Sequence, residues 1–134
     1  MPPVYTVTVT AFALGVSEKW LDNLLSHAEL PGVIKERQGI RRSITEQGVF
    51  AIELVRILSE ELGMSLTSSH NVVSAALSKS MDGDLTFRTR SGVELRFPAE
   101  VLERSLRDRL RDALEAVPPR KRGRPPGKKK NAER

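Results

Sequence analysis

The sequence of 134 residues contains no cysteine. This absence excludes a disulfide framework, a thiolate metal site and a cysteine nucleophile. Aromatic residues make up only 4% of the chain, and the isolated Tyr5 and Trp20 give no stacking platform for single-stranded nucleic acid. The only two histidines, His27 and His70, have no set of other ligands near them in the sequence. We therefore expect neither a metal nor a cofactor.

Catalytic motifs and long apolar runs are also missing from the chain. It has no Gly-rich phosphate loop, no G-x-S-x-G and no H-E-x-x-H, so we do not expect an enzyme. No stretch approaches the roughly 20 apolar residues of a membrane span. The N-terminus also lacks the basic and apolar regions of a signal peptide. These features predict a cytoplasmic protein without membrane contact.

Positive charge is concentrated at the C-terminal end of the chain. Residues 118–134 hold 8 basic residues and 1 acidic residue, so residues 1–117 carry −2 of the total net charge of +5. Such an asymmetry favours a polyanion-binding tail attached to a folded body.

Residues 1–66 are predicted to form a short helix, a turn, a second helix, a hairpin and a long helix. Thr8 or Thr10 would cap the first helix, through residues 11–14, and Gly15 would follow its end. Ser17 would cap a second helix that continues until Pro31-Gly32 stops it. Its apolar stripe consists of Leu21, Leu24, Leu25 and Ala28.

The rest of this unit is predicted to be a basic hairpin and a widely apolar helix. Gln38-Gly39 provides a turn between two short polar-alternating runs. Ser43 and Glu46 match a capping box at the start of a helix that ends before Gly63. This helix is apolar over a wide arc, so we expect it to pack against more than one neighbour.

The element order and the Gly-Val-Ser turn at residues 15–17 resemble the MerR-type winged helix-turn-helix DNA-binding domain over residues 5–66. The resemblance implies that the second helix enters the major groove and that a wing contacts phosphates. On this basis the candidate DNA-binding residues of the domain are Ser17, Lys19, Trp20, Asn23, Lys35, Arg37, Arg41 and Arg42.

Asp22 departs from the family pattern, because it stands where the family usually has an arginine. A carboxylate there repels phosphates. It could instead accept a hydrogen bond from a cytosine amino group or pair with Lys19 on its own helix. An alternative for the whole domain is that the same fold is used only for protein contacts.

Residues 67–117 are predicted to form a helix-hairpin-helix unit. The first helix would run from Ser65 to Met81. Residues 85–97 alternate in two runs, and a three-residue loop over residues 90–92 would pair Phe87 with Leu95. Pro98 would then be the first residue of the last helix. This unit has a thin core, so we expect it to dock on residues 1–66 or on a second copy in a homodimer.

The C-terminal stretch "RKRGRPPGKKK" closely resembles an AT-hook, and it is similar to the Arg-Gly-Arg minor-groove motif of bacterial nucleoid proteins. Glycine lets the backbone approach the floor of a narrow groove, where arginines are attracted by A·T tracts. We expect a disordered tail over residues 118–134. Its candidate DNA-binding residues are Arg120, Lys121, Arg122, Gly123, Arg124, Pro125, Lys128, Lys129 and Lys130. A solvated basic tail and a nuclear-targeting signal remain the alternatives.

Together these patterns predict a mainly α protein with small β hairpins, of the α+β class. The predicted function is a transcriptional regulator or nucleoid-associated protein that binds A·T-rich double-stranded DNA in the cytoplasm, at the nucleoid. An antitoxin-like module that binds a protein partner and makes accessory DNA contacts is the alternative, and RNA binding through the tail is a third possibility.

Overall fold

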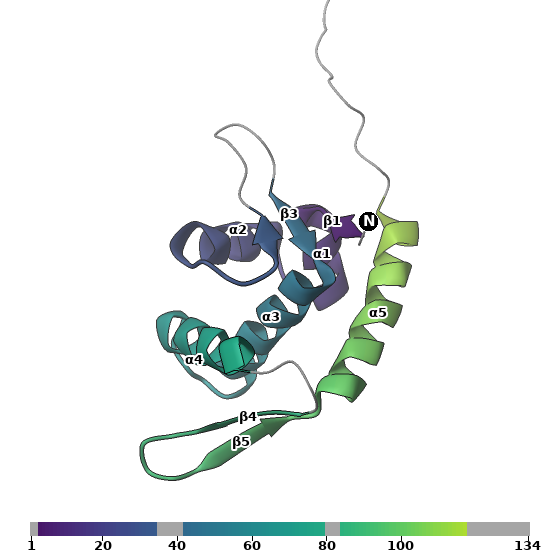
Figure 1. The fold of residues 1–134 in the computed structure, drawn as a ribbon. Coiled ribbons are helices and arrows are strands. Elements are labelled where there is room, and N and C mark those ends of the chain that lie inside the picture. Colours follow the sequence, from purple (N-terminus) through teal and green to yellow (C-terminus); the bar gives the residue numbers. More distant parts are fainter. Residues whose placement is uncertain (1–2, 35–41, 80–83, 118–134) are drawn as a thin grey trace, which may run out of the picture.

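The computed structural model describes residues 3–34, 42–79 and 84–117 (Figure 1). The elements follow the order β1 (Val4–Tyr5), α1 (Val7–Leu14), α2 (Glu18–His27), β2 (Val33–Ile34), β3 (Ser43–Thr45), α3 (Glu46–Arg56), the π-helical turn η1 (Ile57–Glu61), α4 (Leu66–Lys79), β4 (Leu85–Arg88), β5 (Glu94–Phe97) and α5 (Ala99–Ala116). Helices dominate and the sheets are small and antiparallel, which confirms the α+β class. The predicted Gln38-Gly39 turn and the basic tail lie outside the described residues.

The first helix begins earlier than predicted. Thr6, rather than Thr8 or Thr10, is the N-cap of α1, and its hydroxyl oxygen accepts a hydrogen bond from the Val9 N–H at 3.1 Å. The β-branched run that follows has low helix propensity, but Val9 and Thr10 are buried, so packing stabilises the additional turn. Gly15 ends the helix with a φ of 72°, as predicted.

Helix α2 has the predicted cap and the predicted buried stripe. The Ser17 hydroxyl accepts a hydrogen bond from the Trp20 N–H at 3.0 Å, and Leu21, Leu24 and Leu25 are buried. The helix ends at His27, before Pro31-Gly32, because Ala28 is already extended. One face of α2 is therefore fixed to the core, and the opposite face is exposed.

Strand β3 lies in the middle of a three-stranded sheet with the order β1-β3-β2. The capping box predicted at Ser43 is wrong: Ser43 pairs with Ile34 in β3, and the helix begins only at Glu46, three residues later. Thr45 caps α3 instead: its hydroxyl accepts from the Gly48 N–H at 3.2 Å and donates to the Gly32 carbonyl at 2.9 Å. Strand β1 was not predicted, because two residues are too few to show an alternating pattern.

Helix α3 is the buried centre of the molecule. Every residue from Gly48 to Val55 is buried, and the helix packs against α4, α5 and β3. The expectation of more than one packing neighbour is confirmed. Glu53 is buried among these apolar residues and binds two guanidinium groups, with a distance of 2.6 Å to Arg56 Nε and 2.7 Å to Arg109 Nη2. The first of these hydrogen bonds raises the pKa of Arg56 above its ordinary value.

The β4–β5 hairpin has the predicted register. Phe87 pairs with Leu95 and Leu85 with Phe97, and Gly92 in the connecting loop has a φ of 91°. Pro98 is the N-cap of α5 and thus stands one residue before the helix, not at its first position.

The second predicted unit packs on the first, which was one of the two expected alternatives. Its core residues share a hydrophobic cluster with those of α1, α2 and α3: they are Val73, Leu77, Leu85, Phe97, Leu106, Leu110 and Ala113. Helix α5 contacts both α1 and α3, and α2 lies on the other side of these helices (Figure 1). The exposed face of α2 is therefore not used for packing α5.

Candidate nucleic-acid interface

Four of the residues predicted to bind DNA lie together on α2 and the turn before it. Ser17, Lys19, Trp20 and Asn23 line one shallow surface, together with Asp22. Ser17, Lys19 and Asn23 are exposed, whereas Trp20 is half-buried and packs against the core cluster. The structure therefore places polar and apolar groups side by side on one face of a firmly packed helix.

Arg42 reaches the same helix from the residue before β3. Its Nη1 lies 3.6 Å from Asp22 Oδ1, and its Nη2 donates a hydrogen bond to the Ser26 hydroxyl at 3.4 Å. From the sequence, the partner of Asp22 could be a DNA base or Lys19. In the structure its partner is Arg42. The other three candidates near the hairpin, Lys35, Arg37 and Arg41, lie outside the described residues.

The described part of this face has balanced formal charge. Lys19 and Arg42 are its cations, and Glu18 and Asp22 are its anions. Glu18 accepts a hydrogen bond from the Thr8 hydroxyl at 2.9 Å, which joins the start of α2 to α1. The described part of this face therefore carries no excess of positive charge, and the larger positive charge of the sequence lies in residues 118–134.

The two histidines line a second hollow, which adjoins the first at Asn23. This hollow, of about 430 Å³, lies between α2 and the start of α4. His27 Nδ1 donates to the Asn23 carbonyl at 2.8 Å, and His70 Nε2 donates to the Glu29 carbonyl at 2.6 Å. Because 42 residues lie between the two histidines in the chain, no local sequence pattern indicated that they line the same hollow. Within residues 3–34, 42–79 and 84–117, no group of three or more His, Cys, Asp or Glu residues is placed to hold a metal ion.

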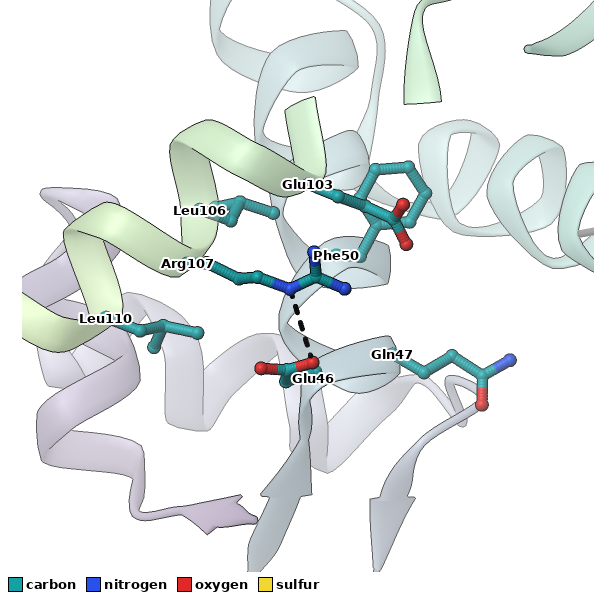
Figure 2. A pocket seen from close by; sticks show the side chains of 7 residues that line it. All are labelled: Glu46, Gln47, Phe50, Glu103, Leu106, Arg107 and Leu110. Carbon is teal, nitrogen blue, oxygen red and sulfur yellow. Dashed lines mark ion pairs between the residues drawn. The ribbon is translucent and has the colours of Figure 1, made fainter. Parts of the chain in front are cut away.

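A third hollow, of about 350 Å³, lies between the first turn of α3 and α5 (Figure 2). Phe50, Leu106 and Leu110 supply its apolar surface, and Arg107 Nε lies 3.7 Å from Glu46 Oε1 at its side. The Glu46 carboxylate also acts on Tyr5. The pKa of Tyr5 is raised, mainly by burial and then by this carboxylate. The sequence indicated an amphipathic α5 but not this cleft, because the position of α5 against α3 depends on long-range packing.

Comparison with known proteins gave no assignment: no protein-family model, no curated protein and no solved structure matches the chain. Among the described residues, no helix is long and apolar enough to cross a membrane. The candidate tail residues, Arg120 to Lys130, lie outside the described residues.

Proposed function

We propose that the protein is a DNA-binding regulator or nucleoid-associated protein with a winged helix-turn-helix body. Helix α2 would read the major groove, and the sheet that contains β2 and β3 would be the base of the wing. The observation that carries this proposal is the grouping of Ser17, Lys19 and Asn23 on one exposed face of a helix whose other face is buried. Lysine and asparagine side chains supply the donors and acceptors that base edges require.

The tail supplies most of the proposed affinity. Its 8 basic residues can neutralise phosphates, and its Gly-Arg-Pro core suits an A·T-rich minor groove. Because the two modules share one chain, binding of either raises the effective concentration of the other near DNA. A homodimer would let two copies of α2 contact two half-sites.

The first experiment measures the affinity of the full chain and of a chain ending at Val117 for A·T-rich and G·C-rich duplexes by fluorescence anisotropy. We expect removal of residues 118–134 to weaken binding at least about 100-fold at moderate salt, because so many phosphate contacts are lost. Equal affinity of the two chains would disprove the role of the tail. If the shorter chain binds A·T-rich and G·C-rich duplexes with the same affinity, the role of α2 is disproved. Structured RNA as a competitor tests the third possibility.

The second experiment separates minor-groove reading from charge within the tail. Gly123→Ala keeps the charge but adds a methyl group where the backbone would approach the groove floor. We expect it to resemble Arg124→Ala, with a loss mainly on A·T-rich duplexes. Lys129→Ala should weaken binding to both duplexes alike and lower the salt slope by about one unit. An unchanged affinity of Gly123→Ala for an A-tract would leave only a basic tail.

A second candidate function is the binding of a protein partner in the cleft between α3 and α5. The observation in its favour is the apolar surface of this cleft, flanked by the exposed Glu46–Arg107 pair (Figure 2). On this reading, a stoichiometric partner co-purifies from native cells with the wild type and is lost with Arg107→Glu, which leaves α2 intact. If the wild type is instead recovered bound to DNA and without a protein partner, the first function is favoured.

A further inference from the structure

Asp22 is an acidic residue on the α2 surface that the proposed function does not explain. We propose that Asp22 acts as a brake on DNA binding: it holds Arg42 in the free protein and competes with DNA phosphates for this guanidinium group. The inference rests on the proposed function and assigns a regulatory role within the same site.

The first observation is the position of Arg42 across one turn of α2. Its two terminal nitrogens lie 3.6 Å from Asp22 Oδ1 and 3.4 Å from Ser26 Oγ. The Ser26 hydroxyl in turn donates to the Asp22 carbonyl at 2.8 Å. Asp22 and Ser26 therefore form one acceptor site for the guanidinium group, which draws Arg42 onto α2.

The second observation is that this site satisfies Arg42 only in part. The Arg42 side chain is 25% exposed, and its buried Nε has no hydrogen-bond partner. Both contacts of its terminal nitrogens are long for charge-assisted hydrogen bonds, which are usually about 2.7–2.9 Å. A guanidinium group with an unused donor gains by moving to a phosphate, whose oxygens can accept two parallel hydrogen bonds.

The third observation is the location of the pair beside the surface that would read DNA. Asp22 is 55% exposed and lines the same shallow surface as Lys19 and Asn23. A duplex on α2 would therefore meet a carboxylate and an arginine that is already occupied. Since phosphates are the same in every sequence, this opposition lowers the affinity for all duplexes and leaves base reading by Lys19 and Asn23 untouched.

The experiment compares the full-length wild type, Asp22→Asn and Glu18→Gln on A·T-rich and G·C-rich duplexes over a range of salt concentrations. Glu18 is the matched control, because it is an exposed carboxylate on the same helix, and it accepts a hydrogen bond from the Thr8 hydroxyl. We expect Asp22→Asn to raise the affinity for both duplexes about tenfold and to steepen the salt slope by about one unit, since one more phosphate is engaged. Glu18→Gln should raise the affinity only about twofold, through the change of net charge.

Two further variants test whether Arg42 carries the effect. Ser26→Ala removes one acceptor of Arg42 without changing the charge, so we expect a rise of about twofold to threefold. In a protein that already carries Arg42→Ala, the Asp22→Asn change should raise the DNA affinity only about as much as Glu18→Gln does in the wild type. Thermal unfolding checks that each variant is folded.

The outcomes separate this inference from the proposed function. If the wild type binds no duplex, the proposed function fails and the inference fails with it. If the wild type binds but Asp22→Asn binds no more tightly than Glu18→Gln, only the brake is disproved. A loss of affinity in Asp22→Asn that is confined to particular sequences would also overturn it, because Asp22 would then be reading a base.

Discussion

Helices α2 and α3 belong to the same half of the chain but are exposed to very different degrees. From Gly48 to Val55, every residue of α3 is buried, whereas α2 buries only Leu21, Leu24 and Leu25. Both begin with a hydroxyl cap, supplied by Thr45 and Ser17. Local helix signals are therefore similar in the two helices, and the packing around them differs.

The difference indicates which helix is free to bind. Substitutions in α3 or its cap should change the stability of the fold, and substitutions on the outer face of α2 should change DNA binding at nearly constant stability. Each variant below is therefore measured twice, by urea unfolding and by DNA affinity.

The largest effect on stability is expected from Glu53→Ala in α3. The Glu53 side chain is 3% exposed and binds both Arg56 and Arg109, so its removal leaves two partly buried cations without their shared carboxylate. Breaking such a buried pair costs about 3–5 kcal/mol of unfolding free energy. Folded protein should keep the DNA affinity of the wild type.

Glu61→Ala is the matched control for this change. Glu61 also binds Arg56, at 3.1 Å, but its side chain is 58% exposed. Exposed ion pairs contribute at most about 1 kcal/mol. If Glu53→Ala and Glu61→Ala lose a similar unfolding free energy, our interpretation that buried contacts of α3 hold α5 in place is contradicted.

The next largest effect is expected from Gly32→Ala, at the contact between the start of β2 and the start of α3. A β-carbon at Gly32 would overlap the Gly48 backbone nitrogen and lie 2.6 Å from Thr45 Oγ1, at a φ of 85°. Overpacking and strain together should cost roughly 3 kcal/mol. In Gly63→Ala, where φ is 75° but no atom lies within 4 Å, only the strain of about 1–2 kcal/mol applies. Equal losses in urea unfolding would show that close packing at Gly32 adds nothing.

The sequence was most informative where a local pattern fixed the structure. Alternation in β4 and β5 allowed only one loop length that kept the apolar faces together, and the observed pairing of Phe87 with Leu95 agrees. Ser17 was also identified correctly, because a serine before an apolar-periodic run is a local signal.

Prediction failed where neighbours distant in the sequence decide between similar local signals. Ser43 and Thr45 both have the chemistry of a cap and both pair in β3, but α3 begins only at Glu46, so Thr45 is the residue that stands next to the helix. The site has the same limit: the residue type of Asp22 raised a question, but its contact with Arg42 depends on how β3 lies against α2. A contact of this kind has no periodic signal in the sequence.

The smallest effect on stability is expected from Asn23→Ala, on the exposed face of α2. Its backbone carbonyl still accepts the hydrogen bond from His27, so unfolding free energy should change by no more than about 0.5 kcal/mol. Affinity for a preferred duplex should nevertheless fall roughly tenfold, because an asparagine amide that reads a base edge is lost. The matched control is Asn71→Ala on the exposed side of α4, which should change neither quantity. If the two variants bind DNA equally well, α2 is exposed without being the reading helix, and the contrast between α2 and α3 then concerns packing alone.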